Sequence, residues 1–151
     1  MKHILSRTNV ELLAQLARSR VLLAFDFDGT LAPIVSTRQS ASMRAKTQTL
    51  FEQVCEQYPC AVISGRSRKD VRERLSNARV KYVVGNHGLE PLYVGDDITD
   101  EDVFELDPPG RLLSIRIGQT RRSAAGYYLR DQREIDRLLA KLHQLRASVG
   151  P

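Results

Sequence analysis

Acidic side chains gather at two points of the sequence, each directly after a short apolar run. Asp26 and Asp28 end the run in "VLLAFDFDG", and Asp96, Asp97 and Asp100 follow the run in "LYVGDDITDED". Carboxylates held together away from water repel one another unless a cation neutralises them. Mg²⁺ suits such a set because it binds a few carboxylates together with water and phosphate oxygens. These five acids are therefore predicted metal ligands.

Small and hydroxyl-bearing residues beside these acids predict a phosphate site. Gly29 leaves room for backbone N–H groups to approach an anion. Ser64 and Gly65 stand just before a predicted helix and offer a hydroxyl and N–H groups in the positive field of its N-terminus. A phosphate site next to a divalent metal indicates phosphoryl transfer through an aspartate nucleophile, because carboxylates form phosphoaspartates and a metal offsets charge on the transferring oxygens.

Each motif taken alone has a plainer interpretation. "SGR" is typical of an ordinary strand-to-helix turn, and "GDDITDED" is typical of an acidic helix N-terminus that complements the helix dipole. "DFDG" also begins like an EF-hand calcium loop, but the twelfth position is Thr37 where that loop needs glutamate. The three motifs in order, each at the end of a predicted strand, favour a functional site over three separate accidents.

The elements that must position these groups alternate along the chain. Apolar runs predict strands over residues 21–27, 60–66, 80–85, 92–95 and 112–118, with a further one over 126–130. Helical spacing of apolar residues predicts helices over 8–18, 42–58, a segment capped by Ser67 with Asp70 three residues on, 99–105 and a last helix capped by Asp131. This alternation predicts an α/β fold with a mostly parallel sheet, with functional groups at the carboxyl ends of the strands.

Composition places the chain among ordinary single globular domains, here residues 1–151. It has 42% hydrophobic and 27% charged residues, and its net charge of +5 is dispersed, which favours a solvated surface over a basic face for phosphorylated ligands or nucleic acid. No nucleic-acid partner is expected. Cys55 and Cys60 are expected to be reduced packing residues. The run "VLLAF" is too short for a membrane span or secretory leader, so no membrane partner and a cytoplasmic location are expected.

Four segments in order resemble a known family. They are "LLAFDFDGTLAPIV", "AVISGRSRKDV", "YVVGNHGLE" and "LYVGDDITDEDVF". Together they resemble the haloacid dehalogenase (HAD) superfamily and, within it, the trehalose 6-phosphate phosphatase family. The resemblance implies a HAD-like Rossmannoid three-layer fold. It also implies Mg²⁺-dependent hydrolysis of a phosphorylated sugar, trehalose 6-phosphate, to trehalose and phosphate through a phosphoaspartate.

The resemblance also implies a role for each motif residue. Asp26 is the implied nucleophile, and Asp28 the acid that protonates the leaving sugar oxygen and then the base that activates water. Mg²⁺ is then held by Asp26, the Asp28 carbonyl and Asp96, with Asp97 and Asp100 in support. The implied phosphate and substrate contacts are Gly29, Thr30, Ser64, Gly65, Arg66, Asn86 and His87. "NHG" is equally typical of a tight turn, so the role of His87 stays open.

One part of the family pattern is missing. In the family a cap domain and a lysine-bearing helix stand between "NHGLE" and "LYVGDD", whereas here residues 86–91 connect the two directly. The chain is thus a single HAD-like core domain with the cap domain absent, its insertion missing between about residues 90 and 91. No lysine occurs between Lys81 and Lys141, and Arg66 is the nearest candidate to compensate.

The short connection leaves two questions open. The chain is either a capless phosphatase or a catalytically impaired remnant that binds metal or phosphate. In the superfamily the third and fourth strands lie roughly 14 Å apart, across three strand spacings, and the chain must also return along the length of a strand. Six residues reach about 20 Å at full stretch, which is barely enough. A displaced fourth strand, an altered pairing or exchange of the C-terminal half between two chains, giving a strand-swapped homodimer, would each relieve that span.

Overall fold

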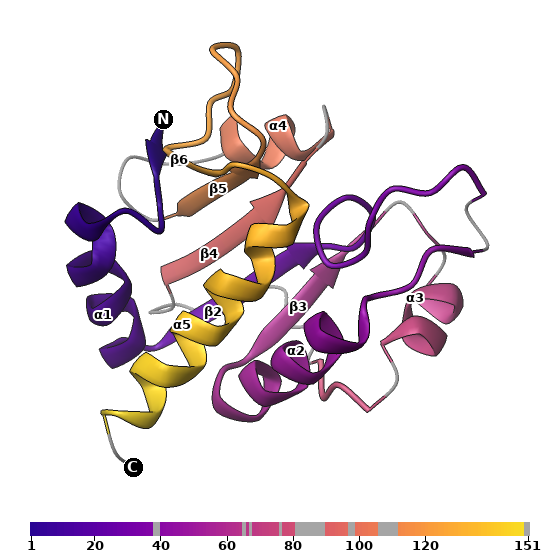
Figure 1. Cartoon of the computed structure of the whole chain (residues 1–151), viewed down its shortest axis with the longest axis horizontal. Helices are drawn as coiled ribbons and strands as arrows, with labels where there is room; N and C mark the ends of the chain where they lie inside the picture. Colours follow the sequence, from indigo (N-terminus) through magenta and orange to yellow (C-terminus); the bar gives the residue numbers. More distant parts are fainter. Residues whose placement is uncertain are drawn as a thin grey trace.

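The computed structural model describes residues 1–37, 40–64, 66, 68–75, 77–80, 90–96, 99–105 and 112–149. Strands and helices alternate along most of this length (Figure 1). In chain order they are β1 (Lys2–His3), η1 (Arg7–Asn9), α1 (Val10–Arg18), β2 (Val21–Asp26), α2 (Ala45–Gln57), β3 (Cys60–Ile63), α3 (Arg68–Arg74), β4 (Glu90–Gly95), α4 (Thr99–Glu105), β5 (Leu113–Ile117), β6 (Tyr127–Leu129), η3 (Gln132–Glu134) and α5 (Ile135–Ala147).

The described strands form one six-stranded sheet in the order β1-β6-β5-β4-β2-β3, with every pairing parallel. β2 lies between β3 and β4, with Phe25 opposite Val62 on one side and Val94 on the other. Parallel strands end at the same edge of a sheet, so the segments that follow β2, β3 and β4 meet there. The sheet therefore assembles the three predicted motifs at one edge.

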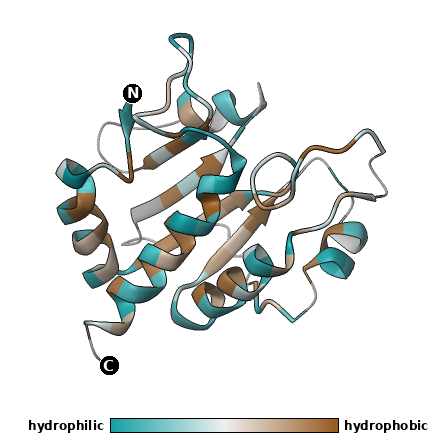
Figure 2. Ribbon diagram, in the orientation of Figure 1, coloured by the Kyte–Doolittle hydropathy of each residue, from teal (hydrophilic) through white to brown (hydrophobic). Residues whose placement is uncertain are grey.

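The two faces of the sheet carry different side chains because successive strand residues point to opposite sides. One face holds the main core, where Leu23, Phe25, Leu92 and Val94 pack with apolar residues of α1, α2, α3 and α5. The opposite face holds a smaller cluster in which Ala24, Ala61 and Tyr93 pack against Phe104 of α4. The helices in Figure 2 are hydrophilic outside and hydrophobic toward the sheet, as amphipathic packing requires.

The predicted elements agree with this architecture at most positions. Helices predicted over 8–18 and 42–58 correspond to α1 with η1 and to α2, and the uncertain strand over 126–130 is β6. The sheet is parallel throughout the described strands, where the sequence predicts a mostly parallel one. The strand predicted over 80–85 and the cap of the third helix, Ser67, lie outside the described residues, apart from Val80, which is not in a strand. β1 was not predicted.

The fourth predicted strand takes an ordinary place in this sheet. β4 pairs in parallel with β2 of the same chain, from Val21 opposite Glu90 to Phe25 opposite Val94. Neither a displaced strand nor an altered pairing is seen in the part of the chain that the structure describes. The connection over residues 86–89 lies outside that part, and the strand-swapped homodimer stays a prediction.

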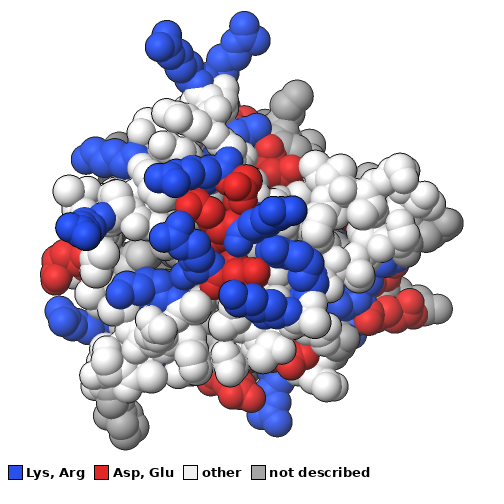
Figure 3. All heavy atoms as spheres, in the orientation of Figure 1, with Lys and Arg blue, Asp and Glu red and all other residues white. Residues whose placement is uncertain are grey.

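The face that carries α5 mixes charges of both signs. Figure 3 shows Lys and Arg side chains around a group of acidic side chains near the middle of this face. Arg137 of α5 pairs with Glu134 of η3 at 2.9 Å, and Arg44, just before α2, pairs with Asp136 of α5 at 3.1 Å. This mixture is typical of a solvated surface. Among the described residues, no helix combines the length and apolar character needed to cross a membrane.

Candidate active site

The chain leaves the end of β2 through a tight turn that carries both predicted catalytic acids. Ala32 N–H donates to Phe27 O, and Gly29 N–H donates to Ala32 O, each at 2.8 Å. Gly29 has a φ of +82°, a left-handed conformation that favours glycine. The turn therefore fixes Asp26 at the strand end and places Asp28 on the loop.

Gly29 has a second reason to lack a side chain. A Cβ atom at this position would lie 2.0 Å from Asp96 Oδ2, far inside van der Waals contact. The sequence predicts that Gly29 leaves space for N–H groups to approach an anion, but its own N–H is bonded within the turn. The space beside its Cα is filled by the Asp96 carboxylate, which brings the end of β4 against the end of β2.

The acids after β4 are held by hydrogen bonds within their own segment. Asp100, at the start of α4, is only 4% exposed, and its Oδ2 accepts from the Asp96 N–H at 2.7 Å. Its Oδ1 accepts from the Tyr93 hydroxyl. A Cβ on Gly95 would lie 2.3 Å from the Asp100 Cγ, so this carboxylate also packs directly on the strand backbone.

Three of the five predicted metal ligands come together. Asp26, Asp96 and Asp100 each offer a carboxylate oxygen, and these oxygens all lie within 4.8 Å of one another. Burial, followed by repulsion from Asp100, Asp96 and Asp28, raises the pKa of Asp26 to about 8, against a smaller opposing effect of the Phe27 N–H. Three acids at this spacing cannot all be charged at neutral pH without a compensating cation.

A divalent cation fits this donor set. The Oδ2 atom of Asp26 is buried and has no hydrogen-bond partner among the described residues, which is a costly arrangement for a carboxylate oxygen. Hard divalent cations prefer carboxylate oxygens. An ion bound here would satisfy that oxygen and remove the repulsion that raises the pKa of Asp26.

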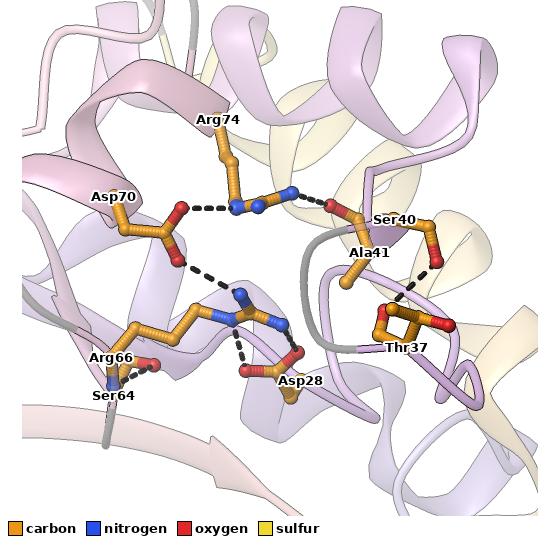
Figure 4. A network of polar contacts seen from close by, with 8 residues as sticks. All are labelled: Asp28, Thr37, Ser40, Ala41, Ser64, Arg66, Asp70 and Arg74. Carbon is orange, nitrogen blue, oxygen red and sulfur yellow. Dashed lines mark hydrogen bonds and ion pairs between the residues drawn. The ribbon is translucent and has the colours of Figure 1, made fainter.

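The predicted acid–base residue, Asp28, is held by Arg66 (Figure 4). Arg66 Nε–H donates to Asp28 Oδ2 and Nη2–H donates to Oδ1, both at 2.6 Å, which is a bidentate ion pair. The Arg66 side chain is 5% exposed, whereas the Asp28 side chain is 36% exposed. The hydrogen bonds to Asp28 raise the pKa of Arg66 above its usual range, so this cation stays charged.

Arg66 belongs to a larger network that includes α3. Its Nη1–H donates to Asp70 Oδ2 at 2.8 Å, and Arg74 Nε–H donates to Asp70 Oδ1 at 2.8 Å. Arg74 also donates to the Ala41 carbonyl, on the loop that leads from the catalytic turn to α2 (Figure 4). The two arginines hold the pKa of Asp70 below its usual range. The network thus links α3 to Asp28 and Ala41, which both lie on the segment between β2 and α2.

The position of Arg66 differs from the role predicted for it. From the sequence, Arg66 is the nearest candidate to compensate in part for the missing lysine beside Asp26, the predicted nucleophile. Its ion pairs are instead with Asp28 and Asp70. Arg66 therefore balances the charge of Asp28, the predicted acid–base residue, and among the described residues no ion pair joins it to Asp26.

Two further predicted phosphate contacts, Thr30 and Ser64, lie in the described part of the chain. Thr30 is fully buried within the turn that follows β2, and its hydroxyl has no hydrogen-bond partner among the described residues. Its carbonyl accepts from Gln132 Nε2–H at 2.9 Å, which ties the turn to η3. Ser64 Oγ accepts from the Arg66 N–H at 3.2 Å. The predicted site residues that lie outside the described part of the chain are Gly65, Asn86, His87 and Asp97.

Two residues at the site were not predicted from the sequence. Tyr93 was read only as part of a buried strand, and Gln132 only as part of a helix start. A signal existed for Tyr93, because a tyrosine inside an aliphatic strand needs a hydrogen-bond partner for its hydroxyl. The side chain of Gln132 gave no comparable signal, since its contact is with a residue about a hundred positions away.

Comparison with known sequences gives one family. A model of the trehalose-phosphatase family matches residues 24–91. A probable trehalose-phosphate phosphatase 2 of Oryza sativa subsp. japonica is 35% identical over 91 residues, which cover 60% of this chain and 24% of that protein. A trehalose-phosphate phosphatase of Mycobacterium ulcerans is 38% identical over 71 residues, 47% of this chain and 18% of that protein. The chain thus matches a quarter or less of the length of these relatives.

Comparison with solved structures gives the same fold. The trehalose-6-phosphate phosphatase of Aspergillus fumigatus superposes with a TM-score of 0.73 and 16% identity, over 95% of this chain and 100% of that chain. The 3-deoxy-D-manno-octulosonate 8-phosphate phosphatase of Moraxella catarrhalis, solved with magnesium, phosphate and KDO, gives a TM-score of 0.61 and 19% identity, over 92% of this chain and 96% of that chain. At these identities the likeness concerns the fold.

Proposed function

Because the chain belongs to the trehalose-phosphatase family of the HAD superfamily, we propose that it is a Mg²⁺-dependent phosphatase of phosphorylated sugars, with trehalose 6-phosphate as its first candidate substrate. The observation that carries the proposal is the meeting of Asp26 with Asp96 and Asp100 at the strand ends, with a buried Asp26 oxygen left unpaired among the described residues. That arrangement costs stability unless a cation occupies the edge.

In the proposed reaction the carboxylate of Asp26 attacks phosphorus, and the bond to the sugar oxygen breaks. Asp28 gives its proton to that oxygen and later takes a proton from the water that hydrolyses the phosphoaspartate. Asp28 lies on the turn beyond the strand end, so it can serve the leaving group while Asp26 attacks from the opposite side. Thr30 and Ser64 are the proposed phosphate positioners, together with Gly65, Asn86 and His87.

The proposed cofactor is Mg²⁺, held by carboxylates of Asp26 and Asp96, the Asp28 carbonyl and, in support, Asp97 and Asp100. When bound, it offsets the negative charge on the transferring phosphoryl oxygens. Its charge would also return Asp26 to the ionised form that a nucleophile needs, since the cluster raises the pKa of Asp26 to about 8.

A specific contact favours the alternative of a catalytically impaired remnant. Both oxygens of Asp28 are engaged by Arg66, and a carboxylate held in this way is not free to protonate a leaving group. The two functions differ in one measurement. A phosphatase turns over 4-nitrophenyl phosphate in Mg²⁺ and stops when the metal is chelated, whereas a remnant binds Mg²⁺ or phosphate without turnover.

We predict that turnover is slow and weakly selective. The site is open in the described part of the chain, where the Asp28 side chain is 36% exposed and Ile34, on the adjoining loop, is 76% exposed. Without a cover, water stays in the site and contacts with the distant part of a disaccharide are lost. Values of kcat/KM for glucose 6-phosphate and trehalose 6-phosphate should agree within about tenfold. A strong preference for the disaccharide would contradict this prediction.

We predict that Asp28→Asn separates two kinds of substrate. Nitrophenolate leaves without a proton, so 4-nitrophenyl phosphate should still give a rapid burst of nitrophenolate equal to the enzyme concentration, followed by slow turnover. A sugar alkoxide needs the proton, so the sugar phosphate should lose both phases, with a fall of about 100-fold or more in rate. Rapid-mixing kinetics distinguish the two. Equal losses for both substrates would remove Asp28 from the acid role.

A further inference from the structure

The hydroxyl of Tyr93 lies in the core next to the acid cluster, on the face of the sheet covered by α4. Tyr93 is 2% exposed, and its ring packs against Phe104 with centroids 5.8 Å apart. Its hydroxyl donates to Asp100 Oδ1. We infer that Tyr93 is a positioning residue for the divalent-metal site, which holds Asp100, and through it Asp96, in the arrangement that binds the ion.

Two consecutive contacts connect the hydroxyl to the metal ligands. Asp100 Oδ1 accepts from Tyr93, and Asp100 Oδ2 accepts from the Asp96 N–H at 2.7 Å. The Asp100 carboxylate is also pressed on Gly95, where a Cβ would lie 2.3 Å from its Cγ. The carboxylate is therefore held between the Tyr93 hydroxyl and the backbone of residues 95–96.

This arrangement decides where the Asp96 side chain points. Its backbone N–H is bonded to Asp100, and its carboxylate reaches the surface of Gly29, within 4.8 Å of the Asp26 oxygen. Without the Tyr93 hydroxyl, Asp100 Oδ1 loses this donor at a position that is 4% exposed, and the carboxylate is held less firmly in its orientation. Partners that orient metal ligands in this way are typically worth 10–100-fold in metal affinity.

The test compares two tyrosines by titration calorimetry with Mg²⁺ alone. Tyr93→Phe is expected to raise the Kd for Mg²⁺ about tenfold or more. Tyr58→Phe is the matched control, because Tyr58 is also 2% exposed and donates to a core acceptor, Leu142 O at 3.0 Å, but packs in the main core on the other face of the sheet. Tyr58→Phe should lower the thermal stability of the chain as much as Tyr93→Phe does, but it should leave the Kd for Mg²⁺ unchanged.

A second variant carries the test if Tyr93→Phe does not fold. Asp100→Asn keeps the shape of the side chain but replaces one of its two accepting oxygens by an NH₂ group, which cannot accept a hydrogen bond from the Tyr93 hydroxyl or the Asp96 N–H. The Kd for Mg²⁺ should therefore rise by at least as much as expected for Tyr93→Phe. If Tyr93→Phe folds, it should add little further loss in the Asp100→Asn background, because both changes break the same chain of contacts. Additive losses, or an unchanged Kd in a folded Tyr93→Phe, overturn the inference.

The inference rests on the proposed function only through the metal, and the two can fail separately. If the wild-type chain shows no turnover but Tyr93→Phe binds Mg²⁺ more weakly than the wild type, the positioning role of Tyr93 is supported and the proposed phosphatase function is contradicted. If the wild-type chain shows turnover but Tyr93→Phe binds Mg²⁺ as tightly as the wild type, the phosphatase function is supported and the positioning role of Tyr93 is contradicted. A wild-type chain that does not bind Mg²⁺ overturns both.

Discussion

Replacing Asp26 by asparagine is expected to reduce turnover of 4-nitrophenyl phosphate at least about a thousandfold, because the amide cannot attack phosphorus. The same change is expected to stabilise the metal-free chain. At neutral pH the wild-type side chain must take up a proton to fold without the metal, because burial and the nearby Asp100, Asp96 and Asp28 disfavour its charged form, whereas the amide is neutral in both states. Undiminished turnover by Asp26→Asn would remove Asp26 from the nucleophile role.

The stability effect has a definite pH dependence. The pKa of Asp26 rises from 3.8 to about 8 on folding, so the folded chain binds this proton more tightly than the unfolded chain. Its contribution to stability is therefore complete below about pH 4 and is lost as the pH rises to about 8. Asp26→Asn removes this loss and should gain on the order of 2–4 kcal/mol in unfolding free energy at pH 7 without Mg²⁺.

Urea unfolding of both proteins at several pH values, in EDTA, measures this difference. The two curves should converge near pH 4 and below, where the wild-type carboxyl is protonated in both the folded and the unfolded chain. Added Mg²⁺ should stabilise the wild type and have a smaller effect on Asp26→Asn, because the variant offers one anionic ligand fewer. A variant that is less stable than the wild type at neutral pH would contradict the electrostatic account of the cluster.

Gly29→Ala is expected to abolish tight Mg²⁺ binding, with a rise of about 100-fold or more in Kd. The added Cβ would stand 2.0 Å from Asp96 Oδ2, so the carboxylate must leave its place beside Asp26 or the turn must open. Either movement takes a ligand out of the cluster. Phosphatase turnover should fall in parallel, and calorimetry with Mg²⁺ measures the loss without depending on turnover.

Gly118→Ala is a closely matched control for this variant. Gly118 has a φ of +83°, almost equal to the +82° of Gly29, but a Cβ there meets no atom within 4 Å. Both variants carry the same cost of a left-handed alanine, about 1 kcal/mol. Only Gly29→Ala should change the Kd for Mg²⁺. Equal effects of the two would show that backbone strain, not the displacement of Asp96, explains the loss.

Much of the site could be predicted because its parts follow a rule of parallel sheets. The runs "VLLAF" and "LYV" are apolar enough to mark buried strands, and acids directly after such strands must meet at the carboxyl edge. That rule puts Asp26 and Asp96 at the same edge, and the pairing of β4 with β2, which the rule does not give, makes them neighbours. β1 could not be predicted, because a strand of two residues, Lys2 and His3, has no periodicity to detect.

The partners of long polar side chains could not be predicted. Arg66 is the nearest sequence candidate to balance charge at Asp26, but a guanidinium at a sheet edge with several acids has several acceptors within reach. The structure selects Asp28 and Asp70, 38 and four positions away in sequence. Such choices depend on distances of a few ångströms between loops, which strand patterns do not specify. The close approach of Asp96 to Gly29 is hidden from the sequence for the same reason.

The pairing of β1 with β6 has a consequence for synthesis of the chain. Lys2 N–H donates to Gly126 O and Ile4 N–H donates to Tyr128 O, so residues at the start of the chain depend on partners about 124 positions later. Contacts this distant in sequence form late in folding. On the ribosome, residues 2–4 leave the exit tunnel long before residues 126–128 are translated, and Ile4, fully buried in the finished protein, stays exposed in the meantime. The nascent chain therefore carries an unpaired β1 until residues 126–128 have been translated.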